Sequence, residues 1–521
     1  MPDLVSVTEK LTAKHTILDG LSLFAMTILS RIPFRSEVLY HWDSVNLAFG
    51  MREFDISIEQ PQPPGYIVYI WLCRLVDALF NNPQTTMVWI AVLSSGLAVG
   101  ATYLLGTAMF GRQAGLIGGL FLASSPLFWF YGEIALPHAL DASLVTLSAF
   151  GLYQVMRGRT RLLCPTIGIL ALVGGVRQQS LIFLLPLVLF ALRGVHWTQL
   201  VAAALLGSGL CLVWAIPLFR SCGGFPQYLK IFSEYSAYYT STTSILSGAG
   251  WSGVGYNLSR IGRYLLYACS AALLPLAAHL LQRSGLSLWR TRRERSAFLG
   301  LWCLPTAMLY TFVHMGQQGT LFTFLPALMI GIGAATVHLV ESWSARSLAL
   351  VSGVLAAINV ALFVALPQYP FGSDSFKVLS WSTLRERDAH YQGKFDTIRN
   401  GYSPERTIIL ASDWRHPQWY LSDYSLLQFD IGEGHDGSRC YVTSMGREAR
   451  FQTLSDLRLA TRPRTESLMV VIFDSELRAF GRSEVRWMDT SSGTNDEIGI
   501  LVLDPQDELL CGPDGYGARK D

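Results

Sequence analysis

Residues 86–110 read TMVWIAVLSSGLAVGATYLLGTAMF, an apolar run without a single charged side chain. A helix needs about 20 such residues to cross the hydrocarbon core of a bilayer. Comparable runs occupy residues 113–130 and 197–219. Because lipid offers no hydrogen-bonding partner to the backbone, segments of this kind must be helical. The chain is therefore predicted to be mostly a helical membrane protein.

The composition supports this class and excludes others. Only 15% of the 521 residues are charged, whereas soluble domains approach about a quarter. The net charge of +2 is too small for the basic field of a nucleic-acid-binding protein. The cysteines show no metal-ligand spacing, and those in or beside apolar runs are predicted to be small packing residues. These are Cys73, Cys164, Cys211, Cys269 and Cys303.

Eleven spans are predicted, and charge decides their direction. They cover residues 17–33, 86–109, 113–131, 138–156, 162–176, 179–193, 198–219, 259–282, 297–313, 320–341 and 347–366. The first shows no cleavage site and is predicted to remain as an anchor. Residues 65–80 carry Arg74 and Asp77, so we predict a helix at the membrane surface rather than a crossing. The basic loops 157–161 and 290–295 then lie in the cytoplasm, and the C-terminus lies outside.

This topology collects the polar segments of the membrane half on one outer face. They are residues 34–85, 131–138, 174–178, 220–257 and 314–319. These segments are far apart in the sequence, and the unusual polar residues of the spans all lie in or beside them. A functional site is therefore expected on the extracytoplasmic side.

The composition changes near residue 370. Residues 371–521 are charged and mixed, with strand-like runs at 407–410, 467–473 and 498–503 and helical periodicity at 447–460. We predict a transmembrane domain at 1–366, with a first outer loop at 34–85, and a soluble extracytoplasmic α/β domain at 367–521. Cys440 and Cys511 are candidates for a disulfide in an oxidising compartment. The predicted fold is thus an α-helical polytopic membrane protein with a C-terminal α/β domain.

The first candidate for chemistry is Asp43, in the stretch LYHWDSVN at residues 39–46. Aspartate is a strong helix N-cap, and a helix beginning near Ser44 would explain Asp43 structurally. The neighbouring His41 and Asn46 favour a functional site on the same loop. The two interpretations are compatible, because a capping residue can also face a substrate.

Asp141 is the second candidate. A carboxylate at the edge of a span is costly and is commonly functional, although a cap at the water boundary is nearly as good an explanation. Glu133 and His138, in the turn that precedes this span, carry the same two interpretations.

Basic and amide side chains complete the candidate set. Arg177 and Gln178 follow two glycines at an outer turn, where an arginine is suited to bidentate phosphate binding. The alternative is an arginine that snorkels to the interface. His314 and Gln317 lie in the turn HMGQQG, which suits sugar hydroxyls or phosphate, or is simply a polar turn stopped by Gly319.

The order of these motifs resembles the GT-C superfamily of integral-membrane glycosyltransferases that use polyprenyl-phosphate sugars. It is most similar to the branch of protein O-mannosyltransferases and lipid A aminoarabinose transferases, over residues 15–345. The similar motifs are WDSVN at 42–46 with PPGY at 63–66, FGR at 110–112, SP at 125–126, PHALD at 137–141, GGVR at 174–177 and HMGQQG at 314–319. Many relatives have a second acid where this chain has Ser44, and often a lysine where it has Arg177.

The resemblance implies an inverting glycosyltransferase with a polyprenyl-phosphate sugar donor and a hydroxyl acceptor on a lipid, glycan or protein. Asp43 would act as the base, Arg177 would hold the leaving phosphate, and Asp141 and His314 would bind sugar or acceptor. His41, Asn46, Glu133, His138, Gln178 and Gln317 would complete the substrate site. No cofactor and no obligatory divalent metal are expected.

Two other classes remain open. A transporter or flippase of lipid-linked glycans would also place charges in spans, but it would typically show inverted repeats, which this sequence lacks. The third class is a membrane-anchored binding protein whose outer domain performs the function. Transfer of sugar from a purified lipid donor separates the three.

Overall fold

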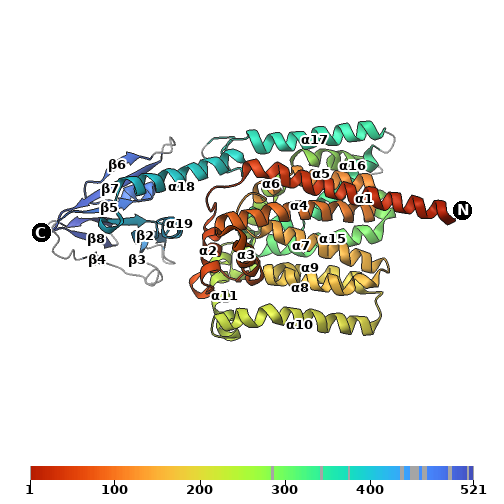
Figure 1. Ribbon diagram of the computed structural model, residues 1–521, viewed down its shortest axis with the longest axis horizontal. Helices are drawn as coiled ribbons and strands as arrows, with labels where there is room; N and C mark the ends of the chain where they lie inside the picture. The colour runs from red at the N-terminus through yellow and green to blue at the C-terminus, as the bar shows by residue number, and fades with distance from the viewer. Residues whose placement is uncertain are drawn as a thin grey trace. The chain divides into compact units, whose positions relative to one another are not determined.

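The computed structural model describes residues 2–282, 287–340, 344–372, 376–433, 439–445, 457–459, 466–490, 496–512 and 515–519 (Figure 1). The chain divides into two compact units. The first contains Met1–Ser36 and Gly50–Thr383, and the second contains Glu37–Phe49 and Leu384–Asp521. The predicted domain limit at residue 366 is therefore close to the observed division, but residues 37–49 of the first outer loop group with the C-terminal residues.

The first unit is helical. Its helices are α1 (Pro2–Arg31), α2 (Trp42–Arg52, shared with the second unit), α3 (Ile67–Phe80), α4 (Pro83–Phe110), α5 (Arg112–Ser124), α6 (Pro126–Tyr131), α7 (His138–Met156), α8 (Leu163–Val176), α9 (Gln178–Leu192), α10 (Trp197–Ser221), α11 (Phe225–Thr240), α12 (Gly250–Cys269), α13 (Leu273–Leu281), α14 (Ser287–Thr291), α15 (Arg293–Phe312), α16 (Leu325–Leu339) and α17 (Ala345–Ala365). Single 3-10 turns include η2 (Ile56–Ile58), η5 (Ser270–Ala272) and η6 (Gln318–Thr323).

Helix α4, which contains the apolar run 86–110, is central to the bundle. It packs against α1, α5 and α7, and most of its side chains are buried by these neighbours (Figure 1). Asn82 caps its start by accepting a hydrogen bond from the Thr85 N–H at 3.0 Å, and Pro83 occupies the first turn, where no N–H is needed. The apolar side chains of this run therefore serve mainly to pack α4 against its neighbouring helices.

All eleven predicted spans are mostly helical over their described residues. Among the described residues, six helical segments are long and apolar enough to cross a membrane: His15–Phe34, Pro83–Phe110, His138–Met156, Trp197–Ser221, Gly250–Leu281 and Ala345–Ala365. Three predicted spans are interrupted, and the one at 320–341 breaks at Phe324, between η6 and α16. The span at 113–131 breaks at Ser125, because Pro126 lacks the N–H that would continue the helix. The span at 259–282 breaks at Ser270, whose φ is +44°.

The two predicted basic loops meet at one end of this unit. Arg157 from the first loop and residues 290–295 from the second line the same hollow. Arg193, predicted to share that side, forms an ion pair with Glu294 in the same region. The prediction from charge that these loops share one face is therefore confirmed.

The second unit is an α/β domain. Its elements are α18 (Trp381–Gly401), β1 (Thr407–Ala411), α19 (Arg415–Tyr420), β2 (Ser425–Glu433), β3 (Arg439–Met445), β4 (Leu457–Leu459), β5 (Leu468–Ile472), β6 (Arg486–Asp489), β7 (Glu497–Leu503), β8 (Glu508–Gly512) and β9 (Gly515–Arg519). A six-stranded sheet has the order β3-β2-β1-β5-β7-β6, and β1 is parallel to both β2 and β5. A three-stranded sheet has the order β4-β8-β9.

Each face of the larger sheet is covered. Tyr391, Phe395 and Ile398 recur at helical spacing on α18 and pack with Ile409 and Val471 on one face. Leu410 and Val470 point to the opposite face, as strand alternation requires, and pack there with the smaller sheet. The three strands predicted from sequence are confirmed as β1, β5 and β7.

Two expectations for this unit concern residues that the structure describes only in part. Helical periodicity was predicted at 447–460, but residues 457–459 form strand β4, which pairs with β8, and residues 446–456 and 460 lie outside the described residues. Cys511 is a buried free thiol, and this does not support the disulfide with Cys440, whose side chain is not described.

Candidate functional site

Asp141 lies at the centre of the candidate site in the first unit. It sits in the first turn of α7, and its side chain is 1% exposed. Its Oδ2 accepts hydrogen bonds from Ser180 Oγ at 3.0 Å, Thr323 Oγ1 at 3.3 Å and Arg177 Nη1 at 3.3 Å. Its Oδ1 has no hydrogen-bond partner among the described residues. The carboxylate is therefore held by three distant segments and keeps one oxygen available for a further donor.

Arg177 is the cation of this buried pair. Its backbone is extended, with φ −146° and ψ 105°, so it separates α8 from α9, and its side chain is 3% exposed. Tyr310 and Tyr66 lie close enough to interact with it electrostatically. Such burial excludes the snorkelling interpretation, because a snorkelling guanidinium reaches water. A buried charge of this kind is retained only when paired and hydrogen-bonded.

The proline-rich motif of the first loop reaches the same place. Gln178 Nε2 donates to the Pro64 carbonyl at 3.3 Å, and the Tyr228 hydroxyl donates to the same carbonyl at 3.4 Å. Gly65 follows with a φ of +107°, which favours glycine, and a Cβ there would approach Leu218 to 2.7 Å. The turn therefore brings Tyr66 toward Arg177.

His138 and Gln317, which the sequence places on the same outer face, lie close together. His138 Nε2 and Gln317 Oε1 are 3.0 Å apart, joining the turn before α7 to the late loop. Gly319 makes this approach possible, because a Cβ there would lie 2.6 Å from the Tyr131 ring and 2.7 Å from His138. Its role is thus close packing within η6, not the helix stop that the sequence indicated.

His314 lies on the other side of the same loop. Its Nδ1 is 3.0 Å from Thr243 Oγ1, and burial together with the positive charge of Arg260 lowers the pKa of His314. Arg260 Nη2 donates to the Gly316 carbonyl at 3.0 Å, and the Met315 N–H donates to Asn257 Oδ1 at 3.1 Å. The 220–257 loop and α12 therefore fix the position of the histidine.

Glu133 is fully buried and lies apart from this hydrogen-bonded network. Burial raises the pKa of Glu133 well above its ordinary value, and the positive charge of Arg31 offsets part of that rise. Its backbone carbonyl accepts a hydrogen bond from the Ser36 N–H at 3.1 Å. These contacts tie the end of α1 to the turn after α6.

His41, Asp43 and Asn46 belong to the second unit. The helix that contains Asp43 begins at Trp42, so Asp43 is not the N-cap considered above. His41 takes that role, because its Nδ1 accepts a hydrogen bond from the Asp43 N–H at 3.1 Å. Burial, followed by the positive charges of Arg387 and Arg415, lowers the pKa of His41 to about 3, so the ring is a neutral acceptor.

The rest of this segment is bound to the C-terminal residues. Arg415 Nε donates to Asn46 Oδ1 at 3.1 Å, and His416 Nε2 donates to the Leu39 carbonyl at 2.7 Å. Asp388 on α18 accepts hydrogen bonds from the backbone N–H groups of Glu37 and Val38. The structure therefore brings Asp141, Arg177, Gln178, His138, Gln317 and His314 together in one unit and places Asp43, His41 and Asn46 in the other.

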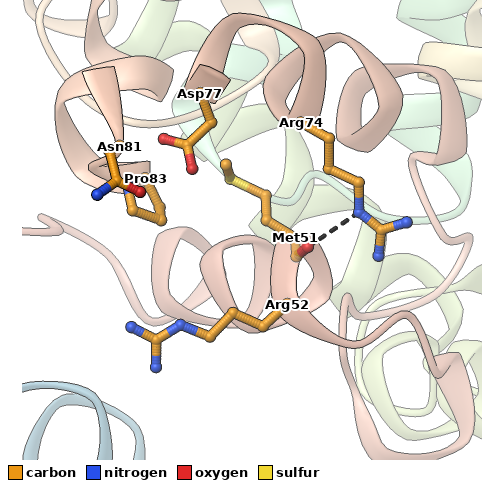
Figure 2. A pocket seen from close by; sticks show the side chains of 6 residues that line it. All are labelled: Met51, Arg52, Arg74, Asp77, Asn81 and Pro83. Atoms are coloured by element: carbon orange, nitrogen blue, oxygen red, sulfur yellow. Dashed lines mark hydrogen bonds between the residues drawn. The ribbon is translucent and has the colours of Figure 1, made fainter. Parts of the chain in front are cut away.

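A separate hollow of about 330 Å³ lies beside α2 and α3 (Figure 2). It is lined by Met51, Arg52, Arg74, Asp77, Asn81 and Pro83. Arg74 donates to the backbone carbonyls of Met51 and Gly50, both at 2.9 Å, and so caps the end of α2 (Figure 2). Asp77 accepts from the Asn82 N–H and from Thr86 Oγ1 at the start of α4. These two charges have structural partners, which explains their presence in the short helix α3.

Several residues of the site were not singled out from the sequence. Ser180, Thr323, Tyr310 and Arg260 are ordinary polar residues of apolar helices until the fold brings them to Asp141 or His314. The only sequence signal available was their polarity within spans. Within the described ranges, no group of three or more His, Cys, Asp or Glu residues is arranged to hold a metal ion.

Residues 61–219 match a family model described as dolichyl-phosphate-mannose-protein mannosyltransferase. No curated protein matches the chain. Among solved structures, ArnT from Cupriavidus metallidurans in the apo state is similar at a TM-score of 0.60 and 13% identity, covering 94% of this chain and 98% of that one. The same protein bound to undecaprenyl phosphate is similar at 0.58 and 13%, covering 93% and 97%.

The chain therefore has a fold similar to that of ArnT, and residues 61–219 match the mannosyltransferase family model. The likeness extends over nearly the whole length of both chains, so the C-terminal α/β unit is part of the shared architecture. The resemblance seen in the sequence motifs is thereby confirmed.

Proposed function

We propose that the protein transfers a sugar from a polyprenyl-phosphate donor to a hydroxyl acceptor on the extracytoplasmic side of the membrane, with inversion. The observation that carries this proposal is the buried Asp141–Arg177 pair with one unpartnered carboxylate oxygen. A buried acceptor without a partner is unfavourable by about 1–3 kcal/mol, so a ligand hydroxyl that donates to Oδ1 would bind favourably. The undecaprenyl phosphate in the similar ArnT structure supports a lipid-phosphate donor.

The Asp141–Arg177 pair and the polar residues around it are proposed to bind the donor and the acceptor. Arg177 contacts the donor phosphate, where a guanidinium offsets the charge that develops on the leaving group. Asp141 positions Arg177 and accepts from a sugar hydroxyl. His138, Gln178, His314 and Gln317 bind the sugar or the acceptor around this pair. The proposal includes no cofactor and no obligatory metal.

Asp43 is proposed as the base that removes the acceptor proton. Its carboxylate is partly exposed, and its position in the first turn of α2 suits the anionic form, because the helix N-terminus favours negative charge. His41 and Asn46, which flank it, are proposed to contribute to the substrate site. Glu133, fully buried beside Arg31, is proposed to contribute to the substrate site.

The activity is tested with purified protein and a radiolabelled polyprenyl-phosphate sugar. Transfer to a hydroxyl acceptor, with the anomeric configuration inverted in the product, is the expected result. The sugar and acceptor are first narrowed by mass spectrometry of surface glycans and lipid-linked sugars in a strain that lacks the protein. Movement of the intact lipid donor across vesicles without transfer would instead indicate a flippase.

The orientation gives a separate prediction. A cysteine at Asp423, an exposed residue of the second unit, should react with an impermeant maleimide in right-side-out vesicles. A cysteine at Arg159, in the basic loop at 157–161, should react only after lysis. Both variants are made in a Cys164→Ser background, because Cys164 is an exposed free thiol. The reverse pattern would contradict the extracytoplasmic assignment.

A further inference from the structure

A second hollow, of about 610 Å³, lies at the basic end of the first unit. Arg157, at the end of α7, and residues 290–295, from α14 and the start of α15, line it. We call this the arginine hollow. Its volume is within the usual range of about 300–1,000 Å³ for small-ligand sites. Two loops separated by more than a hundred residues in sequence thus line one open hollow.

The charge in the arginine hollow is almost all of one sign. Its lining contains five arginines and one glutamate, Glu294. Glu294 pairs with Arg193, which does not line the hollow, so it offsets little of the positive charge inside. The side chains of Arg157, Arg290 and Arg293 form no ion pair or hydrogen bond within the described residues. The N-terminus of the 20-residue helix α15 adds its positive dipole end.

Two aromatic side chains pack beside the arginines of the hollow. The rings of Phe110 and Trp289 meet edge to face at 6.4 Å. The guanidinium groups of Arg292 and Arg295 each lie 5.9 Å from the Phe110 ring centroid. Tryptophan and arginine together at the end of membrane helices are typical of the interface between hydrocarbon and water.

A topology signal alone does not require this arrangement. Positive charge orients a loop wherever it lies on that loop, whereas here the arginines from two loops line one cavity. Arginine clusters recognise phosphate through paired N–H donors. We propose that the arginine hollow binds the phosphate-bearing headgroup of an anionic membrane lipid in the leaflet at that end. This site is at the basic end of the unit and is independent of the proposed transfer reaction.

The test uses full-length purified protein and native mass spectrometry with added lipids. We expect binding in the order cardiolipin, phosphatidylglycerol, phosphatidylcholine, because the first carries two anionic phosphates and the last has no net charge. Arg290→Gln/Arg293→Gln should weaken cardiolipin binding about 30-fold, since each basic residue near an anionic surface contributes about 1 kcal/mol. Binding should also weaken as salt rises.

The matched control is Arg159→Gln/Arg161→Gln. Both arginines are exposed at the same end of the unit, but neither lines the hollow. Their substitution removes the same amount of charge as the test variant. The control should keep wild-type lipid affinity, and both variants should keep the melting temperature of the lipid-free protein. Equal losses in the two variants would overturn the site in favour of general surface charge. Equally tight binding of inorganic phosphate, or of phosphatidylcholine, would overturn the assignment to an anionic lipid.

Discussion

Replacement of Asp43 by asparagine is expected to reduce turnover by about 100- to 10,000-fold, the usual contribution of a general base. The change preserves size and removes the basic carboxylate. It leaves the cap of α2 intact, because His41 Nδ1, not the Asp43 side chain, accepts the hydrogen bond from the backbone. The measurement is single-turnover transfer from the lipid donor by purified protein, with the melting temperature recorded beside it.

Asp55→Asn is the matched control for this experiment. Asp55 lies on the same loop and accepts from the Ser57 N–H at 2.9 Å, which is a capping role that asparagine fills about as well. We expect Asp55→Asn to keep normal activity. If Asp43→Asn keeps it too, Asp43 has no catalytic part, and the same substitution at Asp141 becomes the next test of the base.

Replacement of Arg177 by alanine should abolish donor binding and also destabilise the protein. Removing one partner of a buried ion pair costs about 3–5 kcal/mol, because the remaining charge is left unpaired. Arg177→Lys should keep part of the donor affinity, since the charge survives but the planar fork does not. Donor affinity is measured by titrating the lipid phosphate, and stability by thermal unfolding in detergent.

A double variant separates the two roles of Arg177. In Arg177→Ala/Asp141→Asn no unpaired charge remains, so most of the lost melting temperature should return. Donor binding should stay lost if Arg177 contacts the phosphate, and its recovery would show that the arginine only neutralises Asp141. Arg112→Ala is the control. Arg112 forms the same type of ion pair, with Asp19 at 2.6 Å, but its side chain is exposed.

Much of the architecture was predictable because lipid imposes strong local rules. A run such as residues 86–110 has to be a helix, and the positions of arginines in short loops sort the ends of such helices. The strands at 407–411 and 468–472 were recognisable from their β-branched residues. Helix α18 was missed, because its charged sequence shows its apolar face only through Tyr391, Phe395 and Ile398.

The sequence alone thus determined the membrane class, the helical spans, the α/β character of the C-terminal region and the gathering of polar segments on one face. Only the tertiary structure decided which residues meet. It paired Asp141 with Arg177, added Ser180 and Thr323, gave the cap of α2 to His41, and grouped residues 37–49 with the C-terminal unit. The physical reason is that spans follow from the local balance between hydrocarbon and water, whereas hydrogen bonds between distant residues depend on how the helices pack.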